Sequence, residues 1–174
     1  YKFTYHLEYK NIPILNQNYS ISLKYDNYES AISSCKTFCL LSELLKLHEL
    51  NLIKGGSLKN AVVYIDQKIS TEQEKQIMDL FGIKIDYSKP ILSNIDSIDK
   101  NEAAKHKILD LIGDSHLLGH RIKGHLIASK SGHESNIEFI KKWQNIMYFD
   151  DPFCDFDLLF SAAYSGKRIV ELPV

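Results

Sequence analysis

One stretch, residues 105–136, limits most strongly what this chain can fold into. Within it, His106, Asp110 and Asp114 recur at every fourth position, so on a helix they lie roughly on one face. Apolar side chains at the remaining positions are free to face a core: Ile108, Leu111, Ile112 and Leu118. The pattern predicts an amphipathic helix whose polar face carries an imidazole and two carboxylates, the groups that a metal site or an acid–base site requires.

The polar face of this helix suggests metal chemistry. A catalytic zinc ion typically has three protein ligands and one open position. His106 and Asp110 could supply two of the ligands, while Asp114, one turn further, could accept the ring N–H of a histidine. His133, in the SGH segment that follows, suits that role and would work as an acid near neutral pH. Spacing alone leaves open the commoner alternative, a His/Asp pair on the surface.

The same stretch resembles a known enzyme family. HKILDLIGD, LLGH, IKGH and KSGHESN, together with CKTF at 35–38 and GGSLKNAVV at 55–63, resemble the C-terminal half of UDP-3-O-acyl-N-acetylglucosamine deacetylase. That family is the zinc hydrolase of lipid A biosynthesis. The resemblance covers about residues 1–142 and implies a zinc-dependent amide hydrolase that removes the N-acetyl group of a UDP-linked acyl amino sugar.

The resemblance implies roles for individual residues. His106 and Asp110 match two zinc ligands. His133 matches the histidine that protonates the leaving amine, with Asp114 orienting it, and Thr37 matches the threonine whose hydroxyl helps to hold the oxyanion. A second group matches residues around the sugar, its phosphates or the acyl chain: Lys36, Phe38, Gly56, Ser57, Lys107 and Lys130.

Some of these positions also have simpler interpretations. By itself, Lys107 would more often be a solvated surface lysine, and Gly56 with Ser57 equally indicates a plain turn. In the family, the segment that matches residues 38–63 is an insert forming a hydrophobic passage for the acyl chain. From composition alone, the same segment is an ordinary leucine-rich core helix.

The resemblance also implies that part of the site lies elsewhere. The third zinc ligand, a histidine, and the general-base glutamate belong to the N-terminal domain of the family, which is therefore the expected partner. We expect the polypeptide of residues 1–174 to be inactive, or nearly so, on its own. An alternative from a different class is a non-catalytic fragment that binds a UDP-sugar or an acyl chain.

The last part of the chain carries a second resemblance. Residues 148–174 resemble the end of the catalytic domain of a family 2 glycosyltransferase, with Cys154 in place of the usual glycine. We therefore divide the chain into a deacetylase C-terminal domain, 1–145, and a glycosyltransferase-like tail, 146–174, that arises from a fusion or an artefact. A helix and a strand cannot form a nucleotide-sugar site, so a glycosyltransferase fragment is the weakest alternative.

Composition excludes some classes of function. The net charge of −1 provides no basic field, so nucleic acid is not an expected partner. No apolar run approaches the roughly 20 residues that span a bilayer, and no signal peptide is visible. Three cysteines, an odd number, do not indicate a disulfide framework. We expect a cytoplasmic protein.

Periodicity predicts the other elements. Residues 1–9 alternate between apolar and polar and 19–25 repeat the pattern, which predicts an antiparallel pair of strands. The remaining predictions are helices at 28–34, 40–47, 71–81, 101–118 and 134–144, strands at 61–66, 83–87 and 121–130, and a loop at 90–100. They add up to an α/β fold of the α+β type, in which a small mixed sheet packs against two main helices, with a βαβ-like insert and an appended helix–strand tail.

Overall fold

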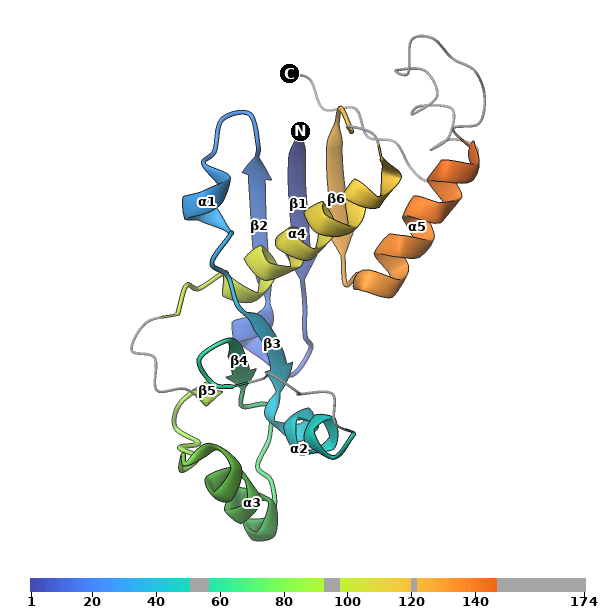
Figure 1. Cartoon of the computed structure of the whole chain (residues 1–174). Coiled ribbons are helices and arrows are strands. Elements are labelled where there is room, and N and C mark those ends of the chain that lie inside the picture. The colour runs from blue at the N-terminus through green and yellow to red at the C-terminus, as the bar shows by residue number, and fades with distance from the viewer. Residues whose placement is uncertain (51–56, 93–97, 120–121, 147–174) are drawn as a thin grey trace.

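Figure 1 presents the computed structural model of the chain, which describes residues 1–50, 57–92, 98–119 and 122–146. The described residues form a mixed α and β fold, and this confirms the predicted fold class. The strands are divided between two three-stranded sheets, in the orders β2-β1-β6 and β3-β4-β5. The predicted tail at 148–174 lies outside the described residues.

The first sheet consists of β1 (Lys2–Leu7), β2 (Gln17–Ser22) and β6 (His125–Ser129). β1 pairs with β2 in the antiparallel direction, as predicted, and with β6 in the parallel direction. The alternation in β1 places Phe3, Tyr5 and Leu7 in the core. This sheet therefore provides an apolar face for a helix.

Thr4 departs from the simple alternation, because it belongs to the polar face of β1 and is nevertheless buried. Its hydroxyl lies 2.6 Å from Oγ of Ser20 in β2 and 2.8 Å from Nε2 of His125 in β6. These two hydrogen bonds satisfy the hydroxyl and tie the three strands together on the face opposite the core.

The second sheet consists of β3 (Thr37–Leu40), β4 (Ala61–Tyr64) and β5 (Ile91–Leu92). β3 and β4 are parallel and are joined through α2 (Leu41–Glu49), which gives the predicted βαβ-like insert. The helix α3 (Thr71–Phe81) follows β4. The insert has its own core, made of apolar residues from these elements: Leu41, Leu44, Leu45, Val63, Ile77 and Leu92.

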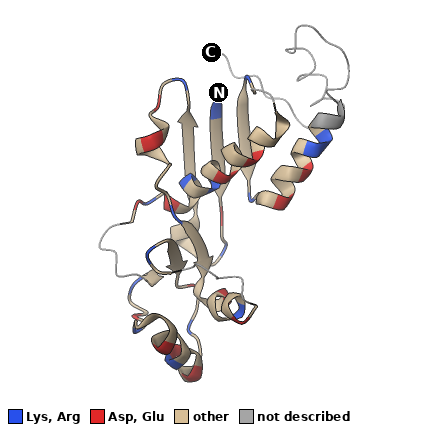
Figure 2. Cartoon of the chain, in the orientation of Figure 1, with Lys and Arg blue, Asp and Glu red and all other residues tan. Residues whose placement is uncertain are grey.

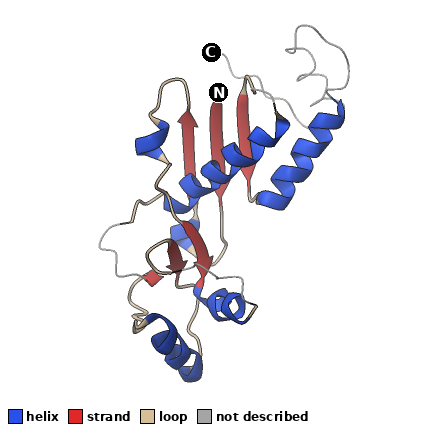
Figure 3. Cartoon of the chain, in the orientation of Figure 1, coloured by secondary structure: helices blue, strands red, loops and turns tan. Residues whose placement is uncertain are grey.

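The two main helices are α4 (Glu102–Ser115) and α5 (His133–Ile146), as predicted. Figure 3 shows α4 lying across the first sheet with α5 beside it. The short helices η1 (Pro13–Leu15), α1 (Tyr28–Ala31) and η2 (His116–Leu118) complete the described elements. One large core, to which β1, β2, β4 and α4 all contribute, joins the two sheets.

A buried amide reinforces this junction. Gln17 is 5% exposed. Its Oε1 accepts a hydrogen bond from the backbone N–H of Ala104, and its Nε2 donates to the carbonyl of Ile14, each at a distance of 2.9 Å. Its side chain also hydrogen bonds to Tyr64 of β4. The N-cap residue of α4, Asn101, makes no side-chain hydrogen bond to the helix, and Gln17 satisfies a first-turn N–H instead.

A capping box of Ser70 and Gln73 begins α3, since Ser70 is the last extended residue, and Gly82 ends the helix in the left-handed conformation. Some local predictions are wrong. Residues 83–87 do not form a strand, whereas β5 lies within the predicted loop at 90–100. The strand β3 was not predicted, since its four residues run directly into α2.

Charges are mixed over the molecule. Figure 2 shows acidic and basic positions interspersed along the described elements. Among the described residues, no helix is long and apolar enough to cross a membrane.

Candidate active site

The polar face predicted from the sequence lies on α4. One face of this helix buries Ala104, Ile108 and Leu111 against the first sheet, and His106, Asp110 and Asp114 follow one another at intervals of one turn. The neighbouring elements are β3 and α5, both of which contact α4. Side chains from β3, α4 and the start of α5 can therefore meet along one line.

The imidazole of His106 has a fixed orientation. Its Nδ1 lies 3.1 Å from the backbone carbonyl of Cys35, and its Nε2 lies 3.4 Å from Oδ1 of Asp110. Because a carbonyl can only accept, Nδ1 must carry the proton of that hydrogen bond. In the neutral ring, the lone pair is then on Nε2 and faces the carboxylate.

His133 repeats this arrangement from the first residue of α5. Its Nδ1 lies 3.0 Å from both carboxylate oxygens of Asp114, and its Nε2 lies 3.6 Å from Oδ1 of Asp110. Asp114 is buried and also accepts a hydrogen bond of 2.8 Å from the buried amide of Asn136. The His133 side chain is 63% exposed, so one face of the ring is open.

Asp110 is the point at which these groups converge. Its Oδ1 faces the Nε2 atoms of both histidines, and its Oδ2 lies 3.4 Å from Nζ of Lys107. The carboxylate is only 12% exposed. Two lone pairs directed at one carboxylate repel each other unless a cation, either a proton or a metal ion, lies between them.

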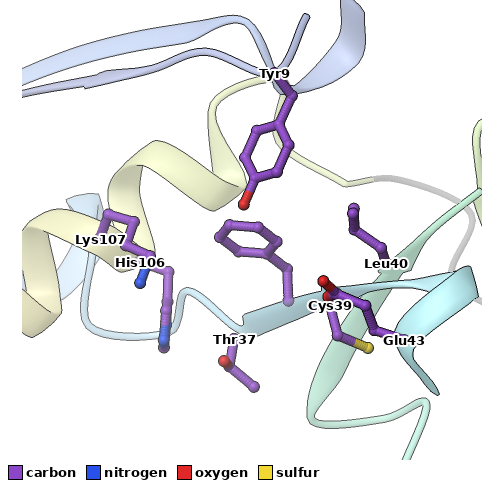
Figure 4. Close-up of a pocket in the computed structure, with 8 residues that line it drawn as sticks. Tyr9, Thr37, Cys39, Leu40, Glu43, His106 and Lys107 are labelled. Atoms are coloured by element: carbon purple, nitrogen blue, oxygen red, sulfur yellow. The ribbon is translucent and has the colours of Figure 1, made fainter. Parts of the chain in front are cut away.

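A pocket of about 150 Å³ adjoins this cluster. Figure 4 shows Lys107 and His106 entering from α4 on one side and Leu40 and Glu43 on the other, with Tyr9 above them. The lining side chains are both apolar and charged: Tyr9, Thr37, Phe38, Cys39, Leu40, Glu43, His106 and Lys107. The pocket can therefore hold a molecule with a polar part and an apolar part.

Aromatic rings form one wall of the pocket. Phe38 contacts Tyr9 edge-on at 6.4 Å and Tyr64 at 5.8 Å between ring centroids. The ammonium of Lys107 lies 5.9 Å from the centroid of Phe38, within the range of a cation–π contact. A positive charge thus lies beside an aromatic surface next to His106.

Burial affects the titration of two pocket residues. It raises the pKa of the Cys39 thiol to about 11, and the Glu43 carboxylate contributes in the same direction. Burial also raises the pKa of Tyr9, again with a smaller contribution from Glu43. Both side chains are thus neutral at physiological pH and act as hydrogen-bonding or packing groups rather than as ions.

The remaining residues predicted for the site are placed differently. The backbone N–H of Lys36 is bound to Glu102, and Lys130 pairs with Glu8 at 3.2 Å. Ser57 is exposed and hydrogen bonds to Asn60, outside the pocket lining. Gly56 lies outside the described residues.

Several residues that contact the site were not predicted from the sequence. Asn136 follows His133 by three positions, so helical spacing could have indicated it. Tyr9 comes from the end of the β1 segment, and no local pattern connects it with α4. The hydroxyl of Tyr5 donates to the carbonyl of Ser131 and anchors the segment before His133.

Within the part of the chain that the structure describes, no group of three or more His, Cys, Asp or Glu side chains could hold a metal ion. His106 and Asp110 fit two positions of a zinc site, since the first offers a nitrogen lone pair with its other ring nitrogen held by a carbonyl, and the second offers a carboxylate oxygen. The donor set is therefore compatible with zinc but incomplete.

Comparison with known proteins shows where similar sequences occur. The family described as LpxC: UDP-3-O-acyl N-acetylglycosamine deacetylase matches residues 1–81 and 86–145. The bifunctional enzyme LpxC/FabZ of Chlorobaculum tepidum is 34% identical over 147 residues, which are 82% of this chain and 31% of that protein. The UDP-3-O-acyl-N-acetylglucosamine deacetylase of Syntrophus aciditrophicus is 37% identical over 141 residues, 81% of this chain and 38% of the relative. The chain thus spans less than two fifths of the length of these two relatives.

Proposed function

This chain belongs to the UDP-3-O-acyl N-acetylglycosamine deacetylase family, and from that premise we propose that it carries the C-terminal half of a zinc-dependent deacetylase site. The reaction would be hydrolysis of the N-acetyl group of UDP-3-O-acyl-N-acetylglucosamine, in lipid A biosynthesis. Water adds to the amide carbonyl, the C–N bond breaks, and acetate and a sugar amine leave. The names of the relatives support this substrate class.

The convergence on Asp110 is the observation that carries the proposal. The Nε2 atoms of His106 and His133 lie 3.4 and 3.6 Å from the same carboxylate oxygen, and each ring has its other nitrogen held by an acceptor. Lone pairs that face a carboxylate are repelled by it unless a proton or a metal ion lies between them, and a zinc ion is the cation that the deacetylase reaction would use.

His106 and Asp110 would hold the zinc ion, with a third ligand that in the family is a histidine of the N-terminal domain. Bound zinc supplies a Lewis acid for the amide carbonyl and lowers the pKa of its water toward about 7. In the family, the general base belongs to an N-terminal domain, which would be the partner of this chain. Residues 1–174 alone should therefore release little acetate.

His133 would deliver the proton to the leaving amine. Asp114 lies 3.0 Å from Nδ1, so Nε2 is the ring nitrogen that would donate the proton to the amine. The exposed face of the ring leaves room for the substrate. Asn136 fixes the opposite side of Asp114. The hydroxyl of Thr37, in the pocket beside His106, would donate to the developing oxyanion, a contribution typically worth about 100- to 1000-fold in rate.

Substrate contacts would come from the pocket and its surroundings. Lys107 would attract the phosphates, and Phe38 would pack against the sugar, since an ammonium and an aromatic face already lie together there. Further substrate-binding residues would be those that the family resemblance assigns to the sugar, its phosphates or the acyl chain: Lys36, Lys130, Gly56 and Ser57. The apolar insert around α2 would accept the acyl chain.

We further propose that the protein is cytoplasmic. Cys35 and Cys39 are both free thiols, as expected in a reducing compartment.

The same pocket supports a second candidate function. A non-catalytic fragment that binds a UDP-sugar or an acyl chain would use the apolar and cationic lining without His133. The two functions differ in one respect: only the deacetylase requires the His133 ring for turnover.

The test is acetate release from UDP-3-O-acyl-N-acetylglucosamine. Residues 1–145 replace the matching segment of the Syntrophus aciditrophicus deacetylase, and the hybrid is compared with its His133→Gln and His125→Gln variants. We expect zinc-dependent activity that falls about 100- to 10,000-fold in His133→Gln and is unchanged in His125→Gln. Equal activity of all three proteins would refute the role of His133, and binding without turnover in all three would favour the second function.

A further inference from the structure

The peptide group between Cys35 and Lys36 is bound at both of its ends by α4. Its N–H, which belongs to Lys36, donates to Oε1 of Glu102 over 2.9 Å. Its carbonyl, which belongs to Cys35, accepts from Nδ1 of His106 over 3.1 Å. Glu102 and His106 are one helical turn apart on α4, about 6 Å along the helix axis.

We propose that Glu102 is a positioning residue that selects the tautomer of His106. In a trans peptide, the C=O and N–H bonds point in opposite directions, and the described residues contain no cis peptide bond. When Glu102 holds the N–H at one end of the turn, the carbonyl is directed at the imidazole at the other end. A carbonyl in that place requires the proton on Nδ1 and leaves the lone pair on Nε2.

The tautomer of His106 determines which ring nitrogen can bind a metal ion. The Nε2 lone pair points at Oδ1 of Asp110, which is the orientation that a metal ligand needs. If the peptide group turned over, its N–H would face His106, and the ring would bind through an unprotonated Nδ1 and carry its proton on Nε2. Glu102 thus decides which ring nitrogen faces Asp110, although it does not contact that carboxylate.

The same peptide group also positions the pocket. Thr37, the next residue, begins β3 and lines the pocket together with His106. Because residues 35 and 36 are bound to two successive turns of α4, the Thr37 hydroxyl and the imidazole are kept in a fixed relation. One carboxylate therefore aligns two of the residues that the deacetylase would use.

This inference rests on the proposed function only where His106 is called a metal ligand, since the tautomer can be measured without zinc. The experiment records the ring ¹⁵N chemical shifts of His106 in metal-free chain, at a pH where the ring is neutral. We compare the native protein with Glu102→Ala, with Glu102→Gln, whose amide oxygen can still accept, and with Glu72→Ala, which removes an exposed first-turn carboxylate from α3.

The native protein and Glu102→Gln should show a proton on Nδ1, and Glu102→Ala should show a mixture of both tautomers. Glu72→Ala should resemble the native protein. A native His106 with its proton on Nε2 would overturn the proposal, even if Glu102→Ala failed to fold. A folded Glu102→Ala variant with an unchanged tautomer would overturn it as well.

Zinc affinity gives a second readout. Only rings with the lone pair on Nε2 can bind, so the apparent zinc affinity of Glu102→Ala should fall with the share of rings that lose this tautomer, about twofold for an equal mixture, while Glu102→Gln should keep near-native affinity. If the native chain binds no zinc while the tautomers behave as described, the proposed function fails and the positioning role of Glu102 stands. If zinc binds equally to all variants and the tautomer does not change, the positioning role fails alone.

Discussion

Replacement of Gln17 by leucine should destabilise the fold strongly, because this side chain joins the two sheets. The amide is 5% exposed and binds the N–H of Ala104, which is fully buried, and the carbonyl of Ile14. Leucine fills a similar volume but leaves both backbone groups without that partner. Each unsatisfied buried group costs about 1–3 kcal/mol of unfolding free energy. Burial of the more apolar leucine side chain offsets part of this cost. We expect a loss of about 2–4 kcal/mol, a large share of a typical free energy of unfolding.

Urea denaturation of the native chain and of the variant measures this loss. The matched comparison is Gln76→Leu, which places leucine at an exposed position of α3 and should change stability by no more than about 0.5 kcal/mol. A Gln17→Leu variant as stable as Gln76→Leu would refute the account of this junction.

Three further predictions concern single side chains. Burial, together with the nearby Lys2, lowers the pKa of His125 below its ordinary 6.5, so the unfolded ring binds a proton at higher pH than the folded one. The stabilising contribution of neutral His125 should therefore be fully present above about pH 6.5 and decrease as the pH falls through that value. The urea midpoints at pH 7.5 and pH 5 should differ less in His125→Gln than in the native chain. Burial raises the pKa of Cys39 to about 11, so iodoacetamide at pH 8 should label this thiol much more slowly in the folded than in the urea-unfolded chain. Peptide mass spectrometry measures the two labelling rates, and equal rates would contradict the burial of Cys39. Asp114→Ala leaves the buried amide of Asn136 without its acceptor and should cost about 1.5–3 kcal/mol in thermal unfolding, while Asp79→Ala, at an exposed position of α3, should cost almost nothing.

Local periodicity accounts for what the sequence could predict. The alternation in β1 and the four-residue repeat from His106 to Asp114 depend only on which face of an element meets the core, so the strand and the helix follow from the order of residues. The same spacing suggested the pairing of Asp114 with His133, and the structure brings these side chains to 3.0 Å.

Contacts between distant segments account for what the sequence could not predict. Gln17 lies 87 positions from Ala104, and Cys35 lies 71 positions from His106, so no local pattern connects them. The strand β5 has only two residues and depends on pairing with β4, and β3 is too short to be separated from the leucine-rich helix that follows. The burial of Thr4 results from its hydrogen bonds to two flanking strands rather than from its own polarity.

Zinc binding by residues 1–174 tests the central claim most directly. The chain is purified free of metal and titrated with zinc against a chromophoric chelator, alongside Asp110→Ala and Asp79→Ala. We predict one site per chain, weaker than a complete site because the family resemblance assigns the third ligand to the N-terminal domain, absent in Asp110→Ala and unchanged in Asp79→Ala. No binding by the native chain, or equal binding by the native chain and Asp110→Ala, would contradict the claim that His106 and Asp110 form half of a zinc site.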